Sequence, residues 1–163
     1  GSDLGEVEVA MPFTSCANAE VVPPAFSAGG GTPMGEAIHK GLNMLKERKG
    51  HYRKQGTAYY QPWMVLLTDG APTDNWQKAA ARIHARCTDR NLVFIGVAVG
   101  NSVDMQTLGA ICPPNRPPKR LQGLRFSAFF EWLSQSMGAV SRSSVGDGSV
   151  KLPDIDGWAA VEN

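Results

Sequence analysis

The fold of this chain is decided by the stretch WMVLLTDG, residues 63–70, which predicts a buried strand followed by a turn. Its first five residues are all apolar, and an uninterrupted apolar run of this length is typical of a strand covered on both faces. A second such run extends from Leu92 to Val99, after a helical segment from Asn75 to Cys87. A helix between two apolar strands is the connection that parallel strands require. The sequence therefore predicts a parallel β-α-β unit over residues 63–99.

A glycine-rich turn lies upstream of this unit and leads directly into another helix. The segment SAGGGTPMGEAI, residues 27–38, places Thr32 as the N-cap and Pro33 at the first helical position. We expect this helix to end at Gly50, because the residues before it are basic and glycine commonly follows a helix. Residues 51–61 are then expected to form a polar loop that leads into the strand.

The two ends of the chain add further elements. Alternating apolar residues over 7–13 predict a half-buried strand, in which Pro12 requires a sheet edge, the end of the strand or a bulge, and residues 20–22 predict a second short strand. Downstream, we expect a short helix over 103–111 and a brief strand over 121–124. The final helix is expected to pack through an apolar face that comprises Phe126, Phe129, Phe130, Leu133, Met137 and Val140.

This alternation of strands and helices predicts an α/β fold, with a mostly parallel sheet and helices on both of its faces. The 163 residues, 42% of them hydrophobic, are enough for one domain with a substantial core. We assign residues 1–143 to that domain and residues 144–163 to a C-terminal tail that docks on it.

Composition excludes several classes of protein. A net charge of +1 provides no global field to attract nucleic acid or an anionic membrane, and no apolar run is long enough to span a bilayer. The three cysteines are odd in number and widely spaced, so neither a disulfide framework nor a zinc site is predicted. Since no secretory leader is visible either, we expect a cytoplasmic protein.

Two residues at the predicted rim of the sheet carry the chemistry. Ligands of open α/β sheets bind beyond the carboxyl ends of the strands, where Asp69 ends a buried strand and Thr32 opens a helix. A carboxylate at such a position is costly unless it is paired or binds a cation, and together with a hydroxyl it offers the oxygen ligands that suit Mg²⁺. The alternative is that Thr32 only caps its helix and Asp69 only caps its turn. Spacing by itself favours this alternative.

Segments 27–38 and 63–76 resemble the von Willebrand factor type A (VWA) domain. They look most like its intracellular bacterial branch, the YegL-like and TerY-like (tellurium-resistance-associated) proteins, and LRFSAFFEWLSQSMGAVSRS, residues 124–143, is similar to the end of that branch. The resemblance implies a Rossmann-like three-layer sandwich with a metal-ion-dependent adhesion site (MIDAS).

On this resemblance, Thr32 and Asp69 would bind Mg²⁺ or Mn²⁺, and a carboxylate of a protein partner would complete the coordination. The predicted partner-binding rim comprises Gly30, Gly31, Asp74 and Trp76, although Trp76 equally fits a packing role at the start of the next helix.

The chain departs from the family pattern in one respect. The third part of a MIDAS is an Asp-x-Ser-x-Ser loop after the family's first strand, and this sequence contains no such pattern; Asp147-Gly148-Ser149 comes nearest. Only six residues precede Val7, whereas a strand, a helix and their connections need about 30. We therefore expect an N-terminally incomplete VWA-like domain that begins at the second strand. With two of its ligands alone, the site is expected to bind metal weakly or not at all.

Three functions remain open. The first is a non-enzymatic protein-binding module, which the resemblance connects with kinase- or phosphatase-like operon proteins in a bacterial stress or tellurite-resistance system. The second is a metal-independent scaffold or assembly subunit that is completed by strand exchange into an oligomer. The third, a metal-dependent phosphoester hydrolase, is disfavoured because no nucleophile or general base is arranged at the rim. The basic stretch from Lys40 to Lys54 is interpreted as a solvated helix end rather than as a nucleic-acid site.

Overall fold

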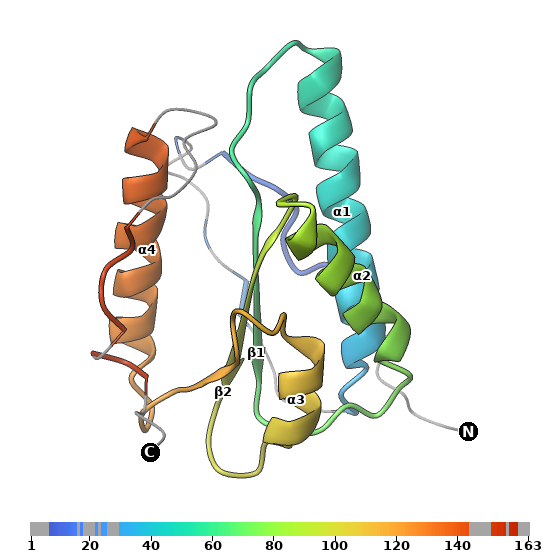
Figure 1. Cartoon of the computed structure of the whole chain (residues 1–163), viewed down its shortest axis with the longest axis vertical. Coiled ribbons are helices and arrows are strands. Elements are labelled where there is room, and N and C mark those ends of the chain that lie inside the picture. The colour runs from blue at the N-terminus through green and yellow to red at the C-terminus, as the bar shows by residue number, and fades with distance from the viewer. Residues whose placement is uncertain are drawn as a thin grey trace.

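The structure is a computed structural model that describes residues 7–15, 17, 22, 24–25, 30–143, 151–155 and 157–159. Helices and strands alternate along most of this length (Figure 1). The elements are α1 (Met34–Lys54), β1 (Trp63–Thr68), α2 (Gln77–Thr88), β2 (Val93–Ala98), α3 (Met105–Ile111), β3 (Lys119–Arg120) and α4 (Phe126–Arg142).

The described strands form one parallel sheet in the order β1-β2-β3. Trp63 pairs with Val93 and Thr68 with Ala98, so β1 and β2 are in register over their full length. Helices α1, α2 and α3 cover one face of this sheet, and α4 covers the other (Figure 1). The predicted β-α-β unit and the α/β fold class are therefore confirmed, and the layering is that of a Rossmann-like sandwich.

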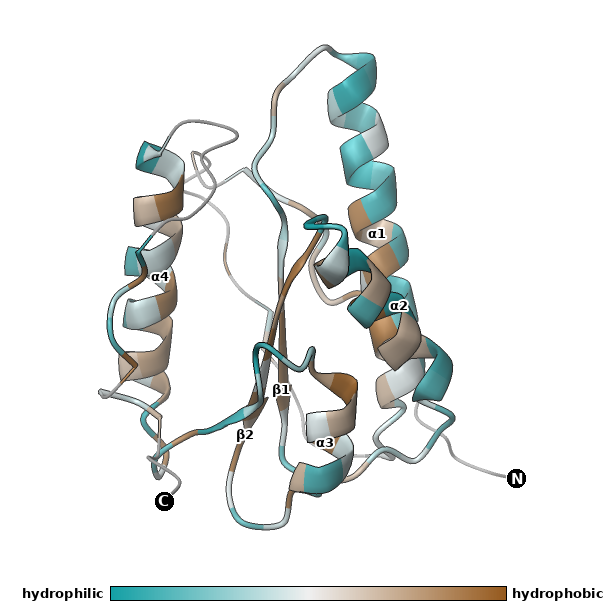
Figure 2. Cartoon of the chain, in the orientation of Figure 1, coloured by the Kyte–Doolittle hydropathy of each residue, from teal (hydrophilic) through white to brown (hydrophobic). Residues whose placement is uncertain are grey.

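Alternate residues of the strands feed two separate cores. Met64 and Leu66 pack toward α1 and α2, whereas Trp63 and Val65 pack toward α4. The period of two along a strand divides the side chains in this way. Leu67 is an exception, since 37% of its surface is exposed at the end of β1. In Figure 2, hydrophobic residues run along β2, whereas the C-terminal half of α1 is mostly hydrophilic.

The predicted strand over 7–13 is wrong: these residues have no strand hydrogen bonding in the structure. Val9, Met11 and Phe13 are instead 39%, 44% and 48% exposed. Alternation alone does not make a strand, because the backbone N–H and C=O groups also need a neighbouring strand. Of the second predicted strand, 20–22, only Val22 lies within the described residues, and it is exposed.

The prediction that α1 ends at Gly50 is also wrong, because the helix continues for another turn to Lys54. Arg48 donates a hydrogen bond from Nε to the Tyr52 hydroxyl across that turn, a stabilising spacing of four residues. The helix ends near Gly56, whose φ of 66° is in the left-handed region that glycine tolerates. One interior glycine costs only about 1 kcal/mol, so local contacts can carry a helix through it.

At the C-terminal end, α4 confirms the predicted helix but only part of its predicted buried face, since Phe126 and Leu133 also pack against the core whereas other members of that face do not. Phe129, Trp132 and Ser136 are buried, whereas Phe130 is 52% and Met137 42% exposed. The brief strand occurs at 119–120 rather than 121–124, and Leu121 makes an isolated bridge to Ala159. Phe129 and Trp132 lie against the buried ring of Trp158, with ring centroids 4.8 Å and 5.2 Å away. The described part of the tail thus packs on α4.

Candidate functional site

Thr32 and Asp69 come from distant parts of the sequence and lie at the same rim of the sheet. Asp69 follows β1 directly and is exposed, and Thr32 precedes α1 and is half-buried. The Thr32 hydroxyl faces the Asp69-Gly70 turn, since a Cβ atom at Gly70 would lie 3.7 Å from Thr32 Oγ1. The structure therefore brings the turn before α1 and the turn after β1 together.

Thr32 is not the N-cap of α1, contrary to prediction. The cap position is Pro33, which makes no side-chain capping hydrogen bond. Asp74 performs the capping from the far side of the rim: its carboxylate accepts hydrogen bonds from the backbone N–H groups of Gly35 at 2.9 Å and Glu36 at 2.8 Å. A carboxylate at this end also interacts favourably with the helix dipole. Sequence spacing could not reveal this arrangement, because a cap is normally sought next to its helix.

Two threonines that sequence reasoning missed hold the rim in shape. Thr73 Oγ1 accepts a hydrogen bond from Thr32 N–H at 3.0 Å, and Thr73 N–H donates to the Thr32 carbonyl at 2.9 Å. Thr68 is buried at the end of β1, and its hydroxyl lies 3.2 Å from the Gly70 carbonyl and 3.3 Å from the Gly70 N–H. A hydroxyl one residue before Asp-Gly is a recognised turn signal, so Thr68 was detectable from sequence.

The hydroxyl of Thr32 and the carboxylate of Asp69 make no hydrogen bond to any other residue that the structure describes. This distinguishes them from the neighbouring polar side chains of Thr68, Thr73 and Asp74, which are all bonded within the rim. The capping alternative for Thr32 is thereby removed. Two oxygen-bearing side chains remain available to a ligand.

Glycines allow the chain segments of the rim to approach one another. A Cβ atom at Gly35 would lie 2.6 Å from the Asn75 carbonyl oxygen and 2.9 Å from Trp76 Cα, so no other residue fits there without moving backbone. Gly31 is close to Thr73 in the same way, at 3.1 Å from its Oγ1, and Gly30 has a φ of 79°. Trp76 occupies the N-cap position just before α2 and packs its half-buried side chain against the α1–α2 core. Whether Gly30, Gly31, Asp74 and Trp76 contact a partner stays a prediction.

The side chains of Thr32 and Asp69 are of the type that binds a divalent cation, but they are too few to fill its coordination shell. A hydroxyl and a carboxylate are hard oxygen donors of the type that Mg²⁺ takes, and Mg²⁺ commonly keeps several waters in its shell. Nowhere in the described ranges do three or more His, Cys, Asp or Glu side chains gather as a metal-binding group. Any cation at Thr32 and Asp69 would therefore depend on water and on ligands from outside the described residues.

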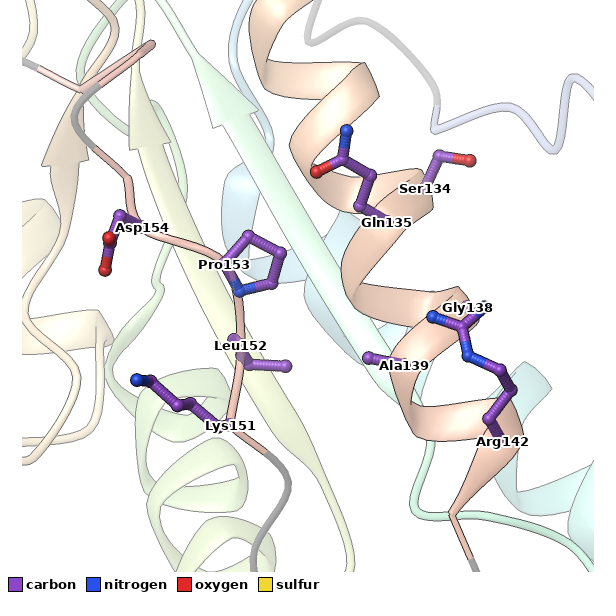
Figure 3. A pocket seen from close by; sticks show the side chains of 9 residues that line it. All are labelled: Ser134, Gln135, Gly138, Ala139, Arg142, Lys151, Leu152, Pro153 and Asp154. Atoms are coloured by element: carbon purple, nitrogen blue, oxygen red, sulfur yellow. The ribbon is translucent and has the colours of Figure 1, made fainter.

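A separate groove of about 600 Å³ lies between α4 and the tail segment 151–154. Figure 3 shows that its charged side chains do not converge: Lys151 and Asp154 extend to one side, and Arg142 lies along the helix on the other. Trp132 Nε1 donates to the Pro153 carbonyl at 2.9 Å at the edge of this contact. We interpret the groove as part of the packing between the tail and α4.

Comparison with known families agrees with this geometry. The model of the von Willebrand factor type A domain matches residues 6–126. The match covers most of the chain, and the chain therefore belongs to the VWA domain family, whose members are protein-interaction modules that typically bind a divalent metal at the MIDAS. No match was found among curated proteins. None of the described helices is both long and apolar enough to span a membrane.

Proposed function

We propose that this chain is a non-catalytic protein-binding module that recognises its partner at the rim formed by Thr32 and Asp69. The observation that carries the proposal is the contrast within the rim. The side chains of Thr68, Thr73 and Asp74 are bonded within it, while those of Thr32 and Asp69 have no hydrogen-bond partner among the described residues. Membership of a family of generally non-enzymatic interaction modules supports the same function.

Metal dependence forms part of the proposal. Thr32 Oγ1 and the Asp69 carboxylate would hold Mg²⁺ or Mn²⁺ weakly, with water completing the shell until an acidic side chain of the partner binds. The cation would supply a Lewis-acidic bridge between two groups that would otherwise repel each other as carboxylates. Weak binding is expected because two protein ligands cannot offset the dehydration that Mg²⁺ resists.

The metal test uses Mn²⁺, because its electron paramagnetic resonance signal separates free from bound ion. Thr32→Val removes the hydroxyl, and Asp69→Asn removes the negative charge and one of the two carboxylate oxygens, both at almost unchanged shape. Asp89→Asn makes the same change at an exposed carboxylate at the other end of α2 and is the matched control. We expect Mn²⁺ binding to weaken in the first two variants and to persist in the control. Equal binding by all three variants would exclude the rim as the metal site.

Partner recognition requires a second test. The resembling branch directs attention to kinase- or phosphatase-like proteins of stress and tellurite-resistance operons, acting in the cytoplasm. Capture of such a partner should need Mg²⁺ and be lost in Asp69→Ala, whose circular dichroism should match that of the unmodified chain. Capture that survives in a folded Asp69→Ala variant would show that the partner binds elsewhere.

A metal-independent scaffold is the second candidate, and the edge of the sheet favours it. The order β1-β2-β3 leaves one side of β1 without a strand among the described residues, and segment 7–13 carries exposed alternating apolar side chains. Unpaired strand edges promote association of chains. Light scattering should then detect oligomers that Val9→Asp with Phe13→Asp reduces, whereas Val22→Asp does not. A strict monomer at high concentration would exclude this candidate.

A further inference from the structure

The C-terminal half of α1 and the loop after it carry a cluster of arginines and tyrosines far from the rim. Arg48 donates from Nε to the Tyr52 hydroxyl at 3.0 Å, and Arg53 donates from Nε to the Tyr59 hydroxyl at 3.1 Å. The Tyr52 and Tyr59 rings stack at 5.8 Å between centroids. We call these four residues the Arg–Tyr cluster. The two guanidinium groups are thus held in place by a rigid aromatic pair.

Both guanidinium groups keep their terminal nitrogens available. The Nε atom of each arginine is used by a tyrosine, but no carboxylate in the described ranges forms an ion pair with Arg48 or Arg53. The remaining edge of a guanidinium group carries N–H donors in a planar fork, which suits a carboxylate or a phosphate. Orientation by tyrosine reduces the conformational entropy that such binding would cost.

The surroundings of the cluster are electropositive. Residues 46–54 contain five of the chain's sixteen basic side chains and one acid, Glu47, and this part of α1 is strongly hydrophilic in Figure 2. Burial lowers the pKa of Lys49; Tyr59 opposes this shift, whereas Arg86 and Arg53 lower the pKa further. Cations of both α1 and α2 therefore act on the Lys49 ammonium group, and no carboxylate is among the groups that shift its pKa.

The aromatic rings indicate which anion fits. Single-stranded nucleic acids bind by stacking bases on free aromatic faces. Here the Tyr52 ring stacks on Tyr59 and lies under the Arg48 guanidinium at 4.9 Å, and Lys49 lies 5.9 Å from the Tyr59 centroid. The ring faces are occupied within the molecule, which leaves the guanidinium forks as the binding groups. Arginine and tyrosine are also among the residue types enriched at protein-binding hot spots.

We propose that the Arg–Tyr cluster is a second protein-binding surface, which takes an acidic, Asp- or Glu-rich segment of a partner polypeptide. The surface lies at the opposite end of α1 from Thr32 (Figure 1), and a helix of 21 residues is about 30 Å long. It is therefore separate from the rim and needs no metal. A partner long enough to reach both ends would gain affinity from each.

Fluorescence anisotropy with a short labelled peptide of alternating glutamate and serine tests this surface. Arg48→Gln with Arg53→Gln removes both forks, and the matched control, Lys78→Gln with Arg116→Gln, makes the same change in net charge at exposed cations elsewhere. We expect a loss of about tenfold or more in peptide affinity for the first pair and little change for the control. Equal losses of peptide affinity in the two double variants would show that net charge alone causes the effect and would overturn the proposal.

Two further comparisons keep the proposal falsifiable if the glutamine variants fold poorly. Arg48→Lys with Arg53→Lys keeps the charge but loses the forks, and should also weaken peptide binding several-fold; full binding by this pair would contradict fork recognition. Oligothymidylate of the same charge as the peptide is the second comparison. If the oligonucleotide binds more tightly than the peptide and is equally weakened in these variants, the ligand of the surface is nucleic acid, and the proposal of an acidic polypeptide is refuted. Absence of peptide binding even at low salt would also refute the surface.

Discussion

Replacing Asp74 separates its role in the fold from any role in binding. Its carboxylate accepts the backbone N–H groups of Gly35 and Glu36, at 2.9 Å and 2.8 Å, and so closes the first turn of α1. Asp74→Ala would leave both donors without this acceptor, although the exposed Glu36 N–H can return to water. A lost cap costs about 0.5–2 kcal/mol and the lost helix-dipole interaction about 0.3–1 kcal/mol. We therefore expect about 2 kcal/mol of destabilisation.

Asp74→Asn refines this expectation. Asparagine keeps one acceptor oxygen but loses the charge, so we expect about half of the effect, roughly 1 kcal/mol. Urea unfolding followed by far-ultraviolet circular dichroism measures both values, and the midpoint should shift at constant slope. Asp89→Ala, at an exposed carboxylate just beyond α2, is the control and should leave stability nearly unchanged.

Two results would refute this reasoning. If the free energy of unfolding of Asp74→Ala is within about 0.5 kcal/mol of that of the unmodified chain, a change typical of ordinary surface positions, the Asp74 carboxylate does not stabilise α1. If Asp74→Ala and Asp89→Ala destabilise equally, the effect belongs to the overall charge rather than to the cap. A stable Asp74→Ala chain with impaired partner capture would place Asp74 in the rim as a binding residue only.

Three further predictions concern the interior. Gly96→Ala should lower the free energy of unfolding by about 1–3 kcal/mol through overpacking, because the new Cβ atom would lie 2.5 Å from Cys112 Sγ. Adding Cys112→Ala should recover part of that loss. If the two changes in unfolding free energy, measured in urea, are simply additive, the contact is refuted. Burial raises the pKa of the Cys112 thiol to about 12, so mass spectrometry should find the peptide that contains it unalkylated when the native chain is treated at pH 10. Because the folded pKa lies above the ordinary 9.0, the contribution of this thiol to stability is complete below pH 9.0 and declines toward pH 12. The Cys112→Ala variant should lack this decline. Ser136→Ala should stabilise the chain by about 1 kcal/mol, because the buried Ser136 hydroxyl has no hydrogen-bond partner in the described part of the chain; a loss of stability would reveal a partner.

The elements that could be predicted from sequence are those whose local pattern and tertiary environment agree. The apolar runs before Asp69 and over 92–99 became the parallel pair β1 and β2, because a strand covered on both faces needs apolar side chains at every position. The helices over 77–88 and 105–111 likewise follow their apolar periodicity. The position of Asp69 after β1 followed from the same run.

Predictions failed where a local signal depended on a distant neighbour. Segment 7–13 alternates like a strand, yet strand hydrogen bonds require a second chain segment that alternation does not supply. Gly50 is a local stop signal, yet α1 continues to Lys54, and the Arg48–Tyr52 contact is one of the interactions that span this turn. On α4 the apolar residues extend around much of the helix, so periodicity did not distinguish the buried Trp132 from the exposed Phe130.

The sequence by itself determined the α/β class, the parallel β1–β2 pair and the two oxygen-bearing residues at its rim, because these depend on short-range patterns. Only the tertiary structure decided what the rim's polar groups do. Asp74 reaches α1 across 38 and 39 residues of sequence to cap it, and that contact leaves the Thr32 hydroxyl uncommitted. The physical reason is that a hydrogen bond depends on the distance between two atoms in space. For residues on different elements of the fold, the number of residues between them does not predict that distance.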